Sequence, residues 1–272
     1  YQLAKLCGDL MNDYIKTDEF LEYLSRNKDR VWVFLDTETL GFDPNKHQMT
    51  EVAAKAVKFN GKRFEEVSSY HEKAQLLSIT RLRMSHPFRG KGMSYRDLMK
   101  MTNYGERTPR GYIEEKIVLG ELYDFLYQFD DPILVAHNSP FDIKYLNARH
   151  NVYYENKSPY DDYEVLDTLK VMKKYFTALV TTEAKRYKHR WLTKKESQHI
   201  LEMRRIRKSL LKNKKKRMSL KLGNVAGSLG VNTDGWHSAK FDVEALISTT
   251  EKMLELFKDN KGKDLHPEKY YL

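Results

Sequence analysis

The sequence predicts an α/β protein built around a mixed five-stranded sheet, and three observations lead to this prediction. Residues 31–35 are five apolar residues in a row, which is typical of a strand buried on both faces. Two segments of alternating character follow, and Asn60-Gly61 between them is a hairpin signal. Farther along, two short strand-like segments each lead into a helical segment, which is the order expected of an α/β fold with a mixed sheet.

The expected elements follow from the spacing of apolar residues along the chain. Residues 1–30 predict a helical extension, because Leu3, Leu6 and Leu10 recur at helical spacing. The five strands are expected at residues 31–35, 51–59, 63–72, 133–136 and 163–166. Helices are expected at residues 114–129, 140–151, 219–229 and 239–257. A further helix is expected to follow the fifth strand and to run through residue 176. The stretch 73–111 is rich in glycine and proline and predicts a long loop with a short helix at 95–101.

Charge is distributed unevenly along the chain. The 272 residues carry a formal net charge of +10, with a pI near 9.3. Residues 182–218 alone hold 15 lysines and arginines against 3 acidic residues, so the rest of the chain sums to −2. We expect this segment to belong to a basic, helical insertion at residues 177–218, and a basic segment of this kind favours a polyanionic partner.

Other classes of protein are disfavoured by composition. No run of eighteen apolar residues occurs, so we expect no membrane partner. Cys7 is the single cysteine, which excludes an intramolecular disulfide and a cysteine zinc site. These features predict a protein of the cytoplasm.

Four acidic residues fall at positions where side chains gather in α/β folds. Asp36 and Glu38 sit at the C-terminal end of the first strand, and positions i and i+2 on a strand point to the same face. Asp142 follows the fourth strand where a helix begins, and Asp242 lies five residues after His237. Functional groups in such sheets collect at strand ends, so we expect these side chains to meet.

Four carboxylates in one place favour divalent cations. Hard oxygen ligands suit Mg²⁺ or Mn²⁺, and two such ions about 3.5–4 Å apart support hydrolysis of a phosphodiester. Two divalent ions would balance the four negative charges. Histidine titrates near neutral pH, so His237 is a candidate to take a proton from water.

At these residues the chain resembles the DEDD superfamily of 3′–5′ exonucleases, specifically its DEDDh branch, which includes the polymerase III epsilon subunit, oligoribonuclease and RNase T. The three motifs are residues 34–41, residues 134–142 and residues 237–242, in the family's order. The tyrosine branch places a tyrosine four residues before the last aspartate. Ser238 stands there and His237 one residue earlier, so the histidine branch is favoured. The resemblance covers roughly residues 30–176 and 219–258.

The resemblance implies an RNase H-like fold and a set of roles. An exonuclease domain is expected at residues 31–258, preceded by the helical extension and followed by a tail at 259–272. Asp36, Glu38 and Asp242 would hold two Mg²⁺ or Mn²⁺ ions, with Asp36 bridging them and Asp142 completing the site. His237 would be the general base.

Substrate contacts are also implied by the resemblance. Thr37, Thr39 and Leu40 would line the pocket of the terminal nucleotide, with Leu40 as a base wedge. Phe141 is a candidate to stack on a base, and His137 and Asn138 to approach the phosphate or sugar. Asp167, which follows the fifth strand, is expected to cap a helix rather than bind metal.

The basic insertion has no counterpart in the family pattern. Tyr187 and Trp191 are candidates to stack on bases, and four neighbouring cations to pair with phosphates: Lys185, Arg186, Lys188 and Arg190. The alternative is a solvated helix without a partner.

The sequence therefore predicts a 3′–5′ exonuclease that acts on single-stranded or 3′-ended DNA and releases nucleoside 5′-monophosphates. One alternative is a 3′–5′ exoribonuclease, because sequence does not show how the pocket treats a 2′-hydroxyl. Another is a nucleic-acid-binding or proofreading subunit of a polymerase complex.

Overall fold

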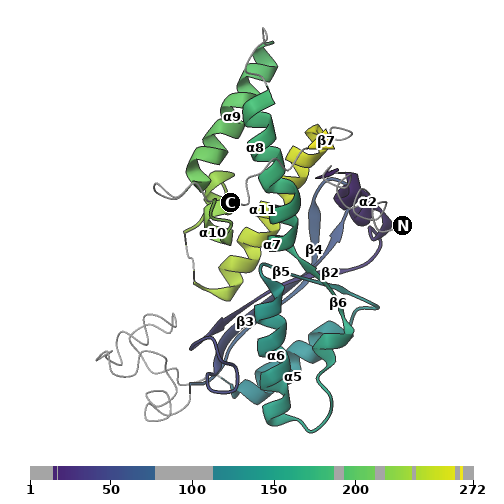
Figure 1. The fold of residues 1–272 in the computed structure, drawn as a ribbon. Coiled ribbons are helices and arrows are strands. Elements are labelled where there is room, and N and C mark those ends of the chain that lie inside the picture. Colours follow the sequence, from purple (N-terminus) through teal and green to yellow (C-terminus); the bar gives the residue numbers. More distant parts are fainter. Residues whose placement is uncertain are drawn as a thin grey trace, which may run out of the picture. The chain divides into compact units, whose positions relative to one another are not determined.

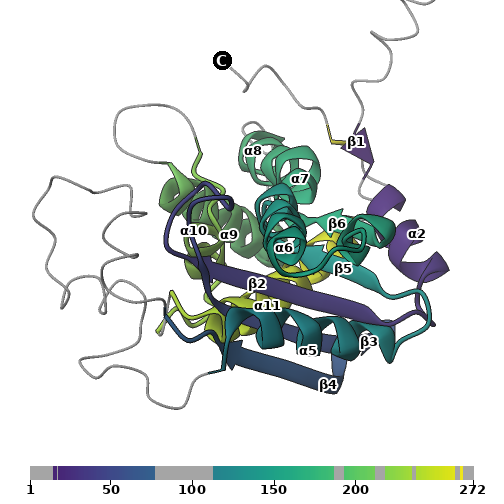
Figure 2. The same cartoon turned by 90° about the horizontal axis from the view of Figure 1, so that it is seen from below.

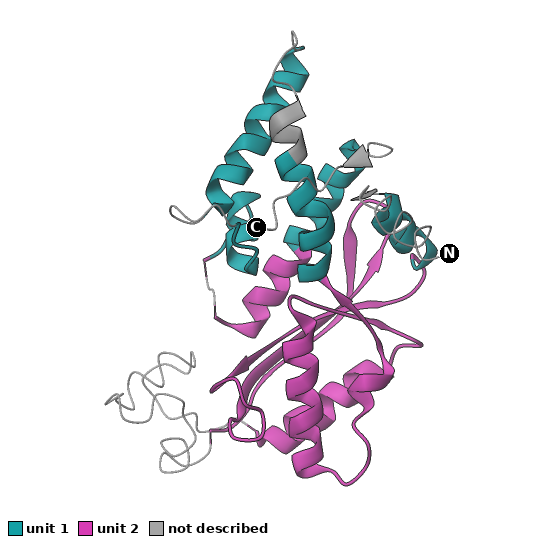
Figure 3. Ribbon diagram, in the orientation of Figure 1, with its two compact units in different colours: residues 1–27, 168–233, 248–272 teal, residues 28–167, 234–247 magenta. Residues whose placement is uncertain are grey.

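The computed structural model describes residues 15–16, 18–76, 113–186, 193–211, 218–234, 237–260 and 264–265 (Figure 1). The chain divides into two compact units (Figure 3). One unit, called here the sheet unit, comprises residues 28–167 and 234–247. The other, the helical unit, comprises residues 1–27, 168–233 and 248–272. The helix predicted at residues 95–101 lies outside the described residues.

A mixed five-stranded sheet forms the centre of the sheet unit, as predicted. Its strands lie in the order β4-β3-β2-β5-β6. Strand β2 pairs antiparallel with β3 and parallel with β5; β3 pairs antiparallel with β4, and β5 parallel with β6. The bounds are Trp32–Thr39 for β2, Met49–Phe59 for β3, Phe64–Lys73 for β4, Ile133–Ala136 for β5 and Glu164–Asp167 for β6.

One face of the sheet packs against helices, and the other carries the acidic residues of β2. Val33 and Leu35 point to one face and join the core formed with helices α5 (Glu115–Tyr127) and α6 (Ser139–Tyr153), which lie on that face (Figure 2). Phe34 packs on Phe64 of β4 at a ring-centroid distance of 5.1 Å. Because side chains alternate along a strand, Phe34, Asp36 and Glu38 share the face opposite Val33. The core face therefore fixes which side carries the acidic residues.

Strand β2 is longer than its apolar run predicts. The expected strand ends at Asp36, whereas β2 continues to Thr39. Pairing with β5 ends at Phe34, but β3 continues the ladder, with Asp36 opposite Ala53 and Glu38 opposite Glu51. The hydrogen bonds of β3 therefore hold the two acidic residues in extended backbone.

A buried ion pair anchors the loop after β2. Arg149 of α6 contacts Glu115 of α5 at 2.6 Å, and both side chains are buried. Arg149 also donates to the carbonyl of Pro44 at 3.2 Å, and Glu115 accepts the backbone N–H of Met49 at 2.9 Å. Two helices are thereby tied to the middle of the loop that links β2 to β3 and to the start of β3.

The helical unit contains two helices that fall within the predicted basic insertion. Helix α8 (Thr177–Arg186) continues directly from α7 (Thr168–Val171) through a π-helical turn, Met172–Phe176. Helix α9 (Lys194–Leu210) begins at a capping box formed by Thr193 and Glu196. Four apolar side chains of α9 are buried: Ile200, Met203, Ile206 and Leu210.

The remaining elements complete the chain. Helix α2 (Asp18–Arg26) lies within the predicted extension, but Ile15–Lys16 form strand β1, paired with β7 (Asp264–Leu265), rather than helix. Helix α10 is Leu222–Ser228, and α11 is Ala239–Asp259. A 3₁₀ turn lies at Pro159–Asp162. Within the described part of the chain, no helix is long and apolar enough to cross a membrane.

Candidate active site and metal centre

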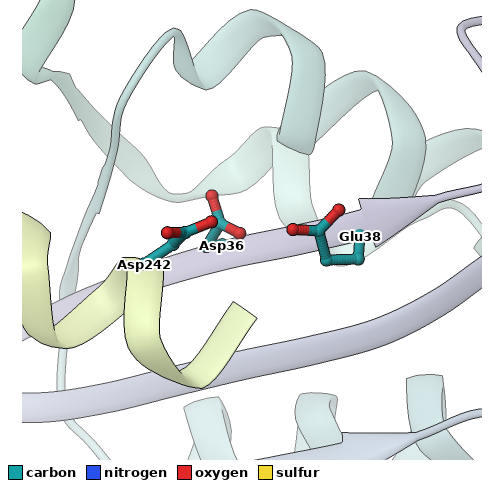
Figure 4. A group of neighbouring side chains, drawn as sticks. All are labelled: Asp36, Glu38 and Asp242. Atoms are coloured by element: carbon teal, nitrogen blue, oxygen red, sulfur yellow. The ribbon is translucent and has the colours of Figure 1, made fainter. Parts of the chain in front are cut away.

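Three of the predicted carboxylates come together in the sheet unit. Asp36, Glu38 and Asp242 each offer one carboxylate oxygen within 4.8 Å of the others. Asp36 and Glu38 lie two residues apart on β2, and Asp242 lies in the first turn of α11. Figure 4 shows the carboxylates of Asp36 and Asp242 turned toward each other, with Glu38 farther along the strand. We call these residues the three-carboxylate group.

Asp142 lies beside this group but is not part of it. It is 3% exposed in the first turn of α6, and its Oδ1 accepts two hydrogen bonds from Thr37. The backbone N–H of Thr37 donates at 3.1 Å and its hydroxyl at 2.8 Å. The side chain of Thr37 points to the face opposite Asp36 and Glu38, because side chains alternate along the strand. Its partner Asp142 therefore has one oxygen turned away from the group, and its metal role stays a prediction.

Thr37 was expected in the nucleotide pocket, and this role stays a prediction. Its side chain is buried, and its hydroxyl is directed to Asp142. Thr37 therefore positions a carboxylate. Side chains alternate along a strand. Because Asp36 and Glu38 share one face of the sheet, Thr37 between them must point to the opposite face.

Glu51 is a fifth carboxylate at the site, and its sequence position indicated only the start of a strand. It is fully buried on β3, directly opposite Glu38. Its Oε1 accepts from Ser238 Oγ at 2.8 Å and lies 2.8 Å from His71 Nε2, while Lys73 Nζ is 3.7 Å from Oε2. The signal in the sequence was the pairing of the first two strands. An antiparallel partner of β2 must place some residue opposite Glu38, and that residue is Glu51.

Burial and mutual repulsion raise the proton affinity of the predicted carboxylates. Burial first, then the charges of Asp142 and Asp242, raise the pKa of Asp36 well above its ordinary value. Burial and the charge of Asp242 raise the pKa of Glu38 to about 7. Burial and the charge of Glu51 raise the pKa of Asp242 to about 7. Burial also raises the pKa of Asp142 to about 7, although its bonds from Thr37 oppose the shift.

Glu51 behaves differently from its neighbours. Burial alone would raise its pKa, but hydrogen bonds from His71 and Ser238 and the charge of Lys73 hold the pKa below the ordinary value. Within the cluster, Glu51 is therefore the carboxyl whose charge is compensated by side chains of the protein. Lys73 also lowers the pKa of Glu38, but there burial and the neighbouring carboxylates outweigh it.

The three-carboxylate group fits divalent cations. Asp242 Oδ1 is buried and has no hydrogen-bond partner among the described residues. A buried carboxylate oxygen without a donor is costly unless a cation faces it. Carboxylate oxygens are the ligands that Mg²⁺ and Mn²⁺ prefer, and a cation would also offset the repulsion that raises these pKa values.

His237 lies on the loop that leads into α11. It is exposed and has a left-handed backbone, with φ of 69°. The carboxylate of Asp242 accepts a hydrogen bond from the backbone N–H of His237, which lowers the pKa of Asp242 against the effect of burial. The predicted base and a predicted metal ligand are thus joined directly, and the role of His237 as a base stays a prediction.

The second motif forms a tight turn between β5 and α6. Asn138 is exposed with φ of 68°, and its backbone N–H donates to Asp167 Oδ1 at 3.0 Å. Asp167 ends β6 opposite Ala136. Asp167 thus supports this turn, and its expected role as a helix cap stays a prediction. His137 beside it is half-buried.

The other pocket residues lie near the loop after β2. Thr39 donates to the carbonyl of Gly41 at 2.8 Å, and Leu40 is 4% exposed. The predicted pocket contacts of both residues, and the wedge role of Leu40, stay predictions. Phe42, for which the sequence predicted no role, is 84% exposed. Phe141 is half-buried and lies edge-on to Phe42, with ring centroids 6.4 Å apart. The pair offers an exposed aromatic surface at this loop.

Most of the insertion residues predicted to contact nucleic acid lie outside the described part of the chain. Lys185 and Arg186 fall at the end of α8, and their side chains are not described. Tyr187, Lys188, Arg190 and Trp191 lie outside the described residues. Their contacts with nucleic acid remain predictions.

No protein-family model and no curated protein sequence matches the chain. Solved structures of exonuclease I do match its fold. One has a TM-score of 0.55 at 14% identity, covering 85% of this chain and 43% of that protein. Exonuclease I of E. coli in complex with a dA16 oligonucleotide has a TM-score of 0.55 at 15% identity, covering 85% and 43%. The zinc-bound form of the same enzyme with single-stranded DNA has a TM-score of 0.54 at 13% identity. The match covers 85% of this chain and 42% of that chain.

These similarities confirm the predicted RNase H-like fold, with its mixed five-stranded sheet flanked by helices. The chain spans less than half the length of the exonuclease I chains that it matches.

Proposed function

We propose that this protein is a metal-dependent 3′–5′ exonuclease that hydrolyses DNA from the 3′ end and releases nucleoside 5′-monophosphates. One observation carries the proposal. Asp36, Glu38 and Asp242 offer carboxylate oxygens within 4.8 Å of one another, and Asp242 Oδ1 is buried without a hydrogen-bond partner among the described residues.

The residues of the site divide the chemistry among them. Asp36, Glu38 and Asp242 would hold the ions, and Asp142, fixed by Thr37, would contribute its remaining oxygen or its charge. Bound divalent ions would supply Lewis acidity for the attacking water and the leaving oxygen. A ring nitrogen of His237 would accept the proton of the attacking water.

The choice of DNA draws on the structural neighbours. Exonuclease I of E. coli has been solved with single-stranded DNA oligonucleotides. The likeness is one of fold at 13–15% identity, so the substrate is part of the proposal. An exoribonuclease would use the same carboxylates.

The basic insertion is proposed to contact the nucleic acid strand. On α9, where four apolar side chains are buried, five cations are exposed: Lys194, Lys195, Arg204, Arg205 and Lys208. Cations that neutralise phosphates strengthen binding in a salt-dependent way. A solvated helix without a partner is the alternative, and the salt dependence of binding distinguishes the two.

One assay tests the activity, the substrate and the polarity together. DNA and RNA strands of one sequence, labelled at the 5′ end, would be incubated with Mg²⁺ or Mn²⁺ and with a chelator. The proposal expects a ladder of DNA shortened from the unlabelled end, only with metal. Release of the 5′ label as a mononucleotide would show that digestion starts at the 5′ end, against the proposed direction. Faster degradation of the RNA than of the DNA would favour the exoribonuclease. No cleavage of either strand would refute the proposal.

A further inference from the structure

His237 is held in a backbone conformation that needs support. Its φ of 69° lies in the left-handed region, which is unfavourable for a residue with a side chain and persists where the surroundings enforce it. The residues that enforce it therefore help to decide where the imidazole lies.

Two carboxylates enforce this conformation from either side. The backbone N–H of His237 donates to the carboxylate of Asp242. The next residue, Ser238, donates its hydroxyl proton to Glu51 Oε1 at 2.8 Å, and its carbonyl accepts the backbone N–H of Asp242 at 3.0 Å. The short segment is thus bound both to α11 and to the sheet.

Glu51 is a rigid anchor for this bond. It lies on a strand with neighbours on both sides, opposite Glu38 on β2 and Lys73 on β4. Its side chain is fully buried, and His71 Nε2 lies 2.8 Å from the same oxygen that Ser238 reaches. A carboxylate fixed in this way cannot follow a loop that moves, so the loop must take its position from the carboxylate.

We propose that Ser238, anchored on Glu51, is a positioning residue that sets the place of the His237 imidazole relative to the three-carboxylate group. This inference rests on the proposed function of His237 as the base. It also gives Glu51 a task that differs from metal binding. A purely structural bond would stabilise the start of α11 without affecting the imidazole.

A double-mutant cycle separates the two roles. Ser238→Ala should lower kcat by about 10–100-fold, the range seen when a group that orients a catalytic residue is lost, and should leave KM and Mn²⁺ affinity unchanged. In the His237→Ala background the same change should have no further effect on kcat, because its target is gone. Ser238→Thr, which keeps the hydroxyl, should restore most of kcat.

A matched control is Ser228→Ala in α10, which removes a hydroxyl that donates to the carbonyl of Val225 at 2.8 Å. It should leave kcat unchanged. If Ser238→Ala and His237→Ala reduce kcat additively, or if Ser238→Ala changes nothing, the positioning role is wrong.

A second measurement does not depend on activity. In protein with isotope-labelled histidine, Ser238→Ala and Glu51→Met should both shift or broaden the NMR signals of the His237 ring, whereas Ser228→Ala should not. Unchanged His237 signals in folded Ser238→Ala protein would overturn the inference. A wild-type protein that cleaves neither DNA nor RNA would instead refute the proposed function, and the NMR result would still decide whether Ser238 positions His237.

Discussion

The carboxylates of the site are close enough to oppose one another's ionisation. Burial raises the pKa of Asp36 most, and four acidic neighbours raise it further. Side-chain hydrogen bonds reach one oxygen of Asp142 and one of Glu51. Among the described residues, Asp242 Oδ1 and Glu51 Oε2 have no hydrogen-bond partner, although Lys73 Nζ lies 3.7 Å from Glu51 Oε2. This is the arrangement expected where a bound cation, rather than the protein, balances the remaining charge.

Replacing Asp36 should therefore separate activity from stability. Asp36→Asn should reduce exonuclease activity by more than about 100-fold, since even outer partners of metal ligands cost roughly 10–100-fold. The same change should raise the melting temperature of the metal-free protein, because it removes a buried like charge. Nuclease assays and thermal melting in chelator test both. Asp162→Asn at an exposed ion pair is the control, and full activity in Asp36→Asn would refute the metal assignment.

Thr37 gives a second test at the scale of one residue. Thr37→Val keeps the shape but removes the hydroxyl that donates to buried Asp142 at 2.8 Å. A hydrogen bond to a charged group contributes about 1.5–3 kcal/mol, so we expect a loss of that size in the free energy of unfolding at pH 8, with reduced activity. Urea unfolding measures it. Thr37→Ser should retain both properties, and an equal loss in the serine variant would contradict the assignment.

At the scale of elements, the loop after β2 depends on α5 and α6. The pair Glu115–Arg149 is buried and also holds the backbone at Pro44 and Met49. Breaking a buried pair by removing one partner costs about 3–5 kcal/mol. Arg149→Met should therefore destabilise the protein by about this amount in urea unfolding. Lys157→Met, which breaks an exposed pair with Asp162, should cause no measurable change. Similar effects of the two variants would contradict the anchoring role.

Helix α9 can be tested through salt. Arg204→Ser combined with Arg205→Ser should weaken binding of single-stranded DNA and reduce the slope of log K against log salt by roughly 0.7 for each phosphate that the variant no longer neutralises. The turnover rate at saturating substrate should not change. A variant with the same reduction in charge, Lys28→Ser with Lys157→Ser, uses exposed cations outside α9. If both double variants give the same slope, net charge alone explains the effect and the proposed role of α9 is refuted.

At the scale of the whole molecule, the raised pKa values couple stability to pH and metal. The pKa values of Glu38, Asp142 and Asp242 rise to about 7 from ordinary values of 4.5, 3.8 and 3.8. The folded protein thus keeps protons that the unfolded chain releases between about pH 4 and pH 7. These groups therefore reduce the stability of the metal-free protein as pH rises through that window.

Metal should reverse this loss, because a cation replaces the protons. The rise in melting temperature caused by Mn²⁺ should be larger at pH 8 than at pH 5. At this chain length, each kcal/mol that metal binding adds to the free energy of unfolding raises the melting temperature by about 2–4 °C. Differential scanning fluorimetry with and without Mn²⁺ measures it. An equal rise at both values of pH would show that Mn²⁺ binds elsewhere, and the rise should be absent in Asp36→Asn.

Much of the fold followed from local patterns. The apolar run at 31–35, the Asn60-Gly61 hairpin and the segment Ile133–Ala136 appear as β2, the β3–β4 hairpin and β5. The end of β2 did not follow, because it depends on how far β3 extends the ladder beyond β5. That distance is set by strands far apart in sequence, and periodicity within one strand carries no information about it.

The sequence by itself determined which acidic residues share a face and which loop carries the histidine. A spacing of two residues along a strand places Asp36 and Glu38 on one face, and the five residues from His237 to Asp242 place the histidine on the loop before the helix. The charge of the insertion follows from composition alone. Only the tertiary structure decided that Glu51 lies opposite Glu38, that Asp142 turns one oxygen to Thr37, and that Phe42 rather than Leu40 is exposed. These three outcomes depend on strand register and on how helices pack against the sheet, because long-range pairing and burial place residues that local spacing cannot.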